Sequence, residues 1–174
     1  MNNILKRITN KKENPNTHKV YIGIDAGKTG AITILRSGLV EFHKMPLIKN
    51  KQGETSLDVE RILDIISPAD YIALEQQFIL PQQGNKSNFT IGFNCGILLA
   101  LCKVTGAKVY TPHPKKWQKF YPSLLRYKGN RVGRKKEVMR LASKMSNQEI
   151  KHDGIGDSCL IAFYAKKITE LKEM

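Results

Sequence analysis

The stretch Val20-Tyr21-Ile22-Gly23-Ile24, which ends at Asp25, decides the fold. Its β-branched and aromatic residues predict a strand. A second apolar run, residues 71–74, ends in the same way at Glu75, and its lack of polar alternation is typical of a strand buried on both faces. A carboxylate in such a place is unfavourable unless it is paired, solvated or bound to a metal. Because open α/β sheets carry their chemistry at strand ends, Asp25 and Glu75 predict a functional site.

The pattern around these two runs predicts one α/β domain. Residues 31–35 and 39–43 read as strands that form an antiparallel meander with the first strand, and residues 107–110 read as a further short strand. Helices are expected over residues 57–66, 89–104, 133–145 and 157–171. This order predicts a five-stranded mixed sheet, with three antiparallel strands followed by parallel strands, flanked by helices.

Charge is distributed very unevenly along the 174 residues. The chain holds 29 Lys and Arg against 15 Asp and Glu, a formal charge of +14. Residues 103–151 alone contain fourteen cationic residues against two acids, whereas residues 52–75 contain six acids against one arginine. A surface this basic attracts polyanions. We expect residues 1–19 to form a flexible basic arm and residues 20–174 to form the single domain.

Several classes of protein are disfavoured by the sequence. The longest uninterrupted apolar run, residues 97–102, is far shorter than the roughly 20 residues of a membrane helix, so no membrane partner is expected. The first 19 residues lack the apolar centre of a secretory signal. Three cysteines without metal or disulfide spacing indicate a reducing compartment. The expected location is the cytoplasm or a site of viral or phage DNA replication, with an organelle left open.

Two more acids, Asp153 and Asp157, lie four residues apart, a spacing that places both on one helix face near its start. Each acid has a structural alternative: Asp153 suits a helix N-cap, Asp25 a turn, and Glu75 the first position of a loop. Together, the four carboxylates could hold two divalent cations about 4 Å apart, the arrangement that cleaves phosphodiesters. Without metal, their mutual repulsion would raise the carboxylate pKa values.

Four motifs, in this order, resemble the RuvC-type Holliday-junction resolvases of the RNase H-like superfamily, particularly the phage and plastid branches. They are YIGIDAG at 21–27, ALEQQF at 73–78, PHPKKWQK at 112–119 and KHDGIGDSCLIA at 151–162. The resemblance implies an RNase H-like fold in which Asp25, Glu75, Asp153 and Asp157 are catalytic and bind two Mg²⁺ or Mn²⁺ ions. It also implies a homodimer that makes paired nicks in a four-way DNA junction.

One departure from the family concerns the last motif, because bacterial members commonly place their final two acids three residues apart rather than four. His152 could therefore replace Asp153 as a ligand or assist the leaving group. The helix at 89–104 carries Gly92 and Gly96, and this pattern of small residues usually reflects internal packing. The resemblance to the family nevertheless makes this helix a candidate for the dimer interface.

The expected nucleic-acid contacts combine an aromatic residue with a basic surface. Phe78, three residues after Glu75, matches a family aromatic that looks positioned to stack on bases, with core packing as the alternative. Clustered cations predict phosphate contacts and steep salt dependence. The full set is Phe78, Gln76, Lys28, Lys115, Lys116, Lys119, Arg131, Arg134, Lys135 and Lys136.

Nucleotide binding fits the sequence less well than nuclease activity. The segment 26–29 hints at a nucleotide-binding loop, but its glycine spacing is one residue short and a strand follows it. The same turn resembles the first phosphate loop of actin- and hexokinase-like ATPases, which need two such domains, so no nucleotide cofactor is expected. A nuclease acting on another structured nucleic acid such as RNA, and a non-catalytic DNA-binding module, stay open as alternatives.

Overall fold

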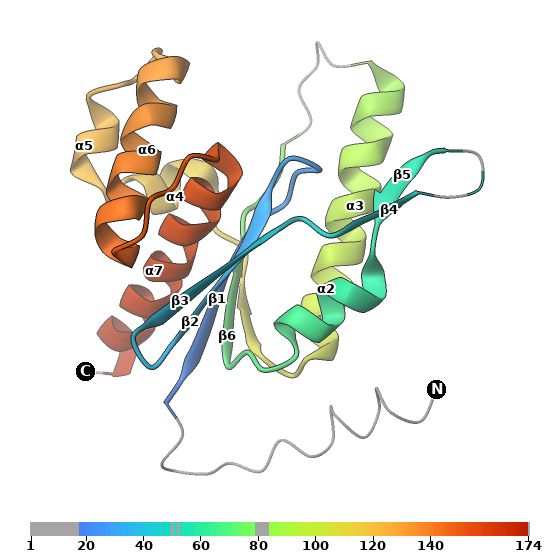
Figure 1. Ribbon diagram of the computed structural model, residues 1–174, viewed down its shortest axis with the longest axis horizontal. Coiled ribbons are helices and arrows are strands. Elements are labelled where there is room, and N and C mark those ends of the chain that lie inside the picture. The colour runs from blue at the N-terminus through green and yellow to red at the C-terminus, as the bar shows by residue number, and fades with distance from the viewer. Residues whose placement is uncertain (1–17, 50, 52, 79–83, 174) are drawn as a thin grey trace.

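The computed structural model describes residues 18–49, 51, 53–78 and 84–173, and the predicted arm therefore lies almost entirely outside the described residues (Figure 1). The centre of the fold is a five-stranded sheet in the order β3-β2-β1-β6-β7. The first three strands pair antiparallel, and β1, β6 and β7 run parallel, as the sequence predicted. The strands are β1 Val20–Asp25, β2 Ala31–Arg36, β3 Leu39–Lys44, β6 Tyr71–Leu74 and β7 Lys108–Tyr110.

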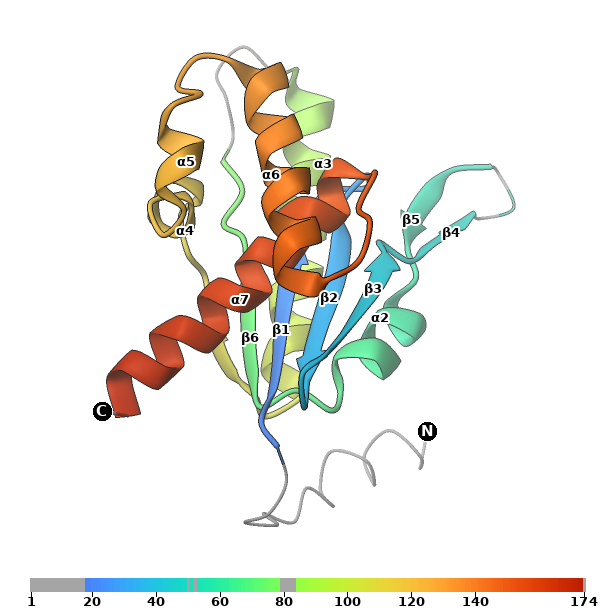
Figure 2. The same cartoon turned by 60° about the vertical axis from the view of Figure 1, so that its left-hand side comes forward.

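Helices cover both faces of the sheet. On one face, α2 (Val59–Ile66) and α3 (Asn85–Val104) pack over an apolar cluster that includes Ile22 and Ile72. On the other face, α7 (Asp153–Glu173) crosses β1 and β2, and α6 (Arg131–Ser146) packs against α7 (Figure 2). Two short helices, α4 (Pro114–Gln118) and α5 (Pro122–Leu125), lead into α6.

Gly23 in the middle of β1 allows α7 to lie directly on the sheet. A Cβ at this position would overlap the backbone oxygen of Ser158 and the backbone nitrogen of Ala162. The side chains of Thr33 and Ser158 then form a buried hydrogen bond of 2.7 Å between β2 and α7. This close approach fixes the start of α7 above the end of β1 that carries Asp25.

A two-stranded hairpin, β4 (Leu47–Lys49) and β5 (Thr55–Leu57), was not predicted. The sequence pattern placed Leu57 at the beginning of a helix, and this was wrong by two residues. Leu57 ends β5, and Asp58 is the N-cap of α2, because its side chain accepts the backbone N–H of Arg61 at 3.0 Å. Strands of three residues, with β4 entirely exposed, leave no alternating pattern to detect.

The predicted helix starts also need correction. The structure begins α3 at Asn85, α6 at Arg131 and α7 at Asp153, each two to four residues before the expected position. For α6 the cause is Asn130, whose side chain accepts the backbone N–H of Gly133 at 2.9 Å. The two short helices α4 and α5 were missed, since each begins with a proline at its first position and is too short to show a helical period.

Helix α3 is long and apolar enough to cross a membrane by length and composition, the one helix of the described residues that meets this test. The prediction of no membrane span rests on uninterrupted apolar runs, and Gly, Thr and Asn residues interrupt the apolar residues of this helix. Leu98 and Cys102 are buried against the sheet, and Phe89 and Phe93 are 73% and 57% exposed. Helix α3 therefore carries an apolar face that nothing within the described chain covers.

Candidate active site

Strand register brings Asp25 and Glu75 to the same edge of the sheet. β1 and β6 pair in parallel with Ile24 opposite Leu74, and the backbone N–H of Glu75 donates to the carbonyl oxygen of Ile24 at 2.9 Å. Side chains two residues apart on a strand share a face, so Asp25 lies on the same face as Gly23, the face that α7 covers. The equivalent register places Glu75 beside it.

The start of α7 adds the other two acids to this edge. Gly154 packs so tightly on the β1–β2 turn that a Cβ there would overlap the carbonyl oxygen of Thr29. Asp153 lies in the first turn of α7, and Asp157 follows one turn later. The structure thus brings together Asp25, Glu75, Asp153 and Asp157, which are up to 132 residues apart in the sequence.

The pKa values of these acids reflect one shared environment. Burial, followed by the negative charges of Asp157, Glu75 and Asp153, raises the pKa of Asp25 to about 8. Burial is also the main cause that raises the pKa of Asp157 to about 7, and Arg134 opposes it. The pKa of Glu75 is raised by burial as well, against the lowering effect of its hydrogen bonds. Buried carboxylates that repel one another are typical of a site that binds a positively charged group.

Two neighbours hold the Glu75 carboxylate in place. The indole Nε1–H of Trp117 in α4 donates to Oε1 at 2.9 Å, and the side-chain amide of Gln77 donates to Oε2 at 3.1 Å. Trp117 is fully buried, so its position is set by packing. Trp117 lies within one of the sequence motifs, but its role could not be predicted, because local sequence contains no signal for a contact between residues 42 positions apart.

Cations from α6 face the two acids at the start of α7. Lys135 Nζ donates to Asp153 Oδ2, and this contact lowers the pKa of Asp153. Arg134 Nη1 lies 3.7 Å from Asp157 Oδ1, too far for a hydrogen bond, and that buried oxygen has no hydrogen-bond partner. Arg134 and Lys135 are also predicted nucleic-acid contacts, and in the structure their side chains lie against these carboxylates.

The N-cap of α7 is His152 and not Asp153. Its Nδ1 accepts the backbone N–H of Ile155 at 3.4 Å, and its carbonyl oxygen accepts the N–H of Gly156 at 3.0 Å. Asp153 accepts only the N–H of the next residue, Gly154, at 3.1 Å, while its second oxygen faces Lys135. The alternative in which Asp153 is simply the helix cap is therefore wrong.

The chemistry of this donor set fits a hard divalent cation. Four carboxylates offer oxygen ligands, and the buried Asp157 oxygen without a hydrogen-bond partner is the kind of atom that such an ion satisfies. Within the described part of the chain, no three Asp, Glu, His or Cys side chains are arranged closely enough to hold a metal ion without moving. Lys135, Arg134 and Trp117 provide the positive charge and hydrogen-bond donors that face these acids.

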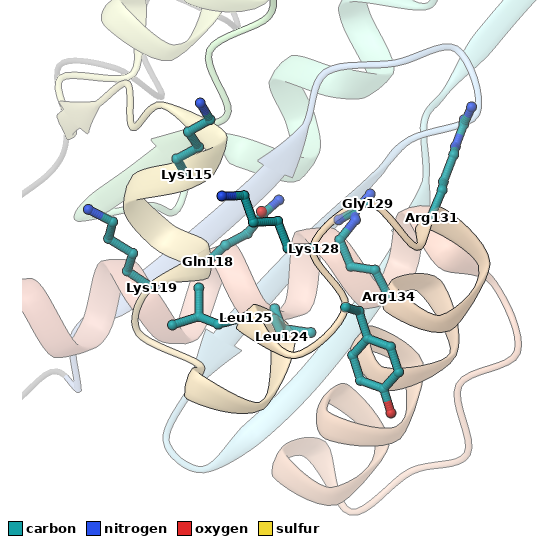
Figure 3. Close-up of a pocket in the computed structure, with 10 residues that line it drawn as sticks. Lys115, Gln118, Lys119, Leu124, Leu125, Lys128, Gly129, Arg131 and Arg134 are labelled. Atoms are coloured by element: carbon teal, nitrogen blue, oxygen red, sulfur yellow. The ribbon is translucent and has the colours of Figure 1, made fainter.

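A basic groove of about 560 Å³ lies beside the acids, between α4, α5 and the start of α6 (Figure 3). Its lining contains five cationic side chains and no carboxylate, with leucine and tyrosine side chains between them. Arg134 belongs both to this groove and to the contact with Asp157. The lining residues are Lys115, Gln118, Lys119, Leu124, Leu125, Tyr127, Lys128, Gly129, Arg131 and Arg134. Four of the five cations, Lys115, Lys119, Arg131 and Arg134, are predicted nucleic-acid contacts, and Lys128 is an additional one.

The other predicted contacts are spread around the site. Phe78 lies three residues after Glu75 and is 41% exposed. Gln76, the residue directly after Glu75, is exposed as well. Lys28 extends away from the acids, because its Nζ donates to the carbonyl oxygen of Thr55 in β5 at 2.9 Å. Lys116 and Lys136 are exposed on α4 and α6 and do not line the groove.

Comparison with solved structures identifies the fold. RuvC from Thermus thermophilus in complex with a Holliday junction substrate is 17% identical to this chain, with 89% of this chain and 97% of that chain covered and a TM-score of 0.59. Another Thermus thermophilus RuvC structure is 19% identical, with 88% and 96% covered and a TM-score of 0.56. Scanning protein-family models and curated proteins gave no match. The chain has the RuvC-type, RNase H-like fold that the sequence resemblance predicted.

Proposed function

We propose that this protein is a metal-dependent endonuclease that resolves four-way DNA junctions. The observation that carries the proposal is the meeting of Asp25, Glu75 and Asp157 at one sheet edge beside a groove of five cations. Acids at strand ends with adjoining cations suit a reaction on a phosphodiester, since the acids hold cations and the basic groove holds the phosphate backbone. The similarity in fold to a junction-bound RuvC supports the choice of DNA substrate.

The residues that would hold Mg²⁺ or Mn²⁺ are Asp25, Glu75, Asp157 and Asp153, two ions to a site. When bound, such ions activate water and stabilise the leaving oxygen. Trp117 keeps the Glu75 carboxylate oriented for this task. Arg134 and Lys135 each contact an acid, and Arg134 also lines the groove, from which it can contact phosphate once the acids hold cations.

A homodimer is part of the proposal, and α3 is its interface. Phe89 and Phe93 stack on each other with ring centroids 5.9 Å apart, and both are exposed. Gly92 and Gly96 have open space around them, which lets a second helix approach closely. A two-fold dimer would present two sites to a substrate that is itself close to two-fold symmetric. Light scattering should give twice the chain mass for the parent protein and the chain mass for Phe93→Glu.

The decisive experiment incubates the protein with a synthetic four-way junction and Mg²⁺ and maps the nicks. We expect symmetric nicks in opposite strands that disappear on addition of EDTA. Structured RNA of similar size, tested in parallel, distinguishes a ribonuclease, and a junction that is bound but never cut with Mg²⁺ or Mn²⁺ identifies a non-catalytic binding module. Either of these results would overturn the proposal.

A further inference from the structure

The segment between β7 and α4 joins the loop that follows β6. The backbone N–H of Gln76 donates to the carbonyl oxygen of Pro112 at 3.0 Å, so the two chain segments stay paired beyond the ends of their strands. His113 is the next residue along the chain. This pairing places His113 opposite the residues that follow Glu75.

The His113 ring packs on Phe78. Their ring centroids are 4.4 Å apart with the planes tilted by 46°, a contact within the range of favourable aromatic pairs. Phe78 is 41% exposed, so one side of its ring rests on His113 while a large part stays open to solvent. An aromatic ring supported in this way has fewer positions available than a free side chain on a loop.

His113 itself is held by its role as the N-cap of α4. Its Nδ1 accepts the backbone N–H of Lys115 at 3.0 Å, which leaves the proton of the neutral imidazole on Nε2. Pro114 occupies the first position of the helix and restricts the backbone there. The backbone at the start of α4 sets the position of the ring, and this hydrogen bond adds to it.

The other end of α4 holds the acid. Trp117, one turn after the cap, donates to Glu75, three residues before Phe78. One short helix thus contacts both the carboxylate and the aromatic residue. The distance between the two side chains depends on α4 as well as on the loop between them.

We propose that His113 is the positioning residue of Phe78: its ring, held at the start of α4 by the backbone on either side, supports the Phe78 ring so that a base can stack on its open side. The proposal rests on the proposed function, because it assumes that Phe78 stacks on nucleic acid. His113 then has two roles, support of the Phe78 ring and capping of α4, and substitutions can separate them.

The test uses full-length protein and a four-way junction with 2-aminopurine at the branch point, in EDTA so that no strand is cut. His113→Asn keeps an oxygen that can cap α4 and removes the ring, and His113→Phe keeps the ring and removes the cap. When the junction binds, we expect the fluorescence change with His113→Asn to be as small as that with Phe78→Ala. His113→Phe should retain most of the change seen with the parent protein. With Mg²⁺, His113→Asn should lower kcat about tenfold, about 1.4 kcal/mol, and leave KM unchanged.

Three results separate this inference from the proposed function. The Phe78→Ala, His113→Asn double variant should be no worse than Phe78→Ala, because the two rings act as one unit. If Phe78→Ala loses the signal and His113→Asn keeps it, the positioning role is overturned while the nuclease stands. If Phe78→Ala keeps the signal, stacking itself is wrong and the inference falls with it. His18→Asn, an exposed histidine before β1, is the matched control and should behave as the parent protein.

Discussion

Replacing Asp25 with asparagine should stabilise the metal-free protein at alkaline pH. The pKa of Asp25 is raised from 3.8 to about 8, first by burial and then by the charges of Asp157, Glu75 and Asp153. Between about pH 4 and pH 8 the native protein keeps a proton that the unfolded chain releases. The free energy of unfolding therefore falls as pH rises through this window. Asparagine stays neutral at every pH, so the free energy of unfolding of the variant does not fall for this reason.

The size of the effect follows from the same shift. Each pKa unit corresponds to 1.36 kcal/mol, so the full shift sets an upper limit of roughly 5–6 kcal/mol above pH 8. Part of this shift comes from the negative charge of Asp157, whose own pKa is about 7, and the polarisable surroundings of a strand end reduce the penalty. We expect Asp25→Asn to gain about 2 kcal/mol over the parent protein at pH 8, and almost nothing at pH 4.

Urea unfolding from pH 4 to pH 8.5, in EDTA and in Mg²⁺, measures this difference. The single tryptophan, Trp117, lies next to Glu75 and reports unfolding by fluorescence. In Mg²⁺ the order should reverse, because an ion at a hundred times its Kd stabilises the parent protein by about 2.7 kcal/mol and the variant has lost a ligand. Glu41→Gln, at an exposed carboxylate of β3, is the control. Parallel pH profiles for Asp25→Asn and the parent protein, or equal stabilisation of both by Mg²⁺, would refute the reasoning.

Three further predictions test other parts of the site. Glu75→Gln should abolish junction cleavage and leave junction binding unchanged in a gel-shift assay, since it removes a cation ligand and no basic residue; retained cleavage would contradict the ligand role. Gly23→Ala should destabilise the protein by about 3 kcal/mol in urea unfolding, because the new methyl group overlaps the backbone of Ala162, and a smaller loss than about 1 kcal/mol would speak against the tight contact. The double variant Lys119→Ala, Arg131→Ala should reduce the slope of log Kd against log salt by about 2, and an unchanged slope would mean that the groove contacts no phosphate.

The sheet and the two strand-end acids could be predicted because their signals are local. An apolar run followed by a carboxylate marks both β1 and β6, and the run of strands before the first helix fixes the antiparallel half of the sheet. The spacing of Asp153 and Asp157 likewise placed them on one helix face. In each case the residues that carry the signal are neighbours in the sequence.

The partners of the acids could not be predicted because they depend on tertiary packing. Trp117 reaches Glu75 from a five-residue helix, and Lys135 and Arg134 reach the start of α7 from α6. From the sequence, Lys135 and Arg134 are simply two residues of a basic cluster. Only the packing of α6 on α7 distinguishes them from exposed neighbours such as Lys136. The hairpin of β4 and β5 escaped because its strands are three residues long and β4 is fully exposed, which leaves no alternating pattern.

The parallel pairing of β1 with β6 has a consequence for variation in this protein. Neighbouring residues of a strand point to opposite faces, so one residue inserted within β6 would turn Glu75 toward α2 and α3 without breaking the hydrogen-bonded ladder. Length changes in β1 or β6 would then displace an acid from the site in a protein that still folds. Engineered or natural length variants that stay active should therefore carry their insertions outside these two strands.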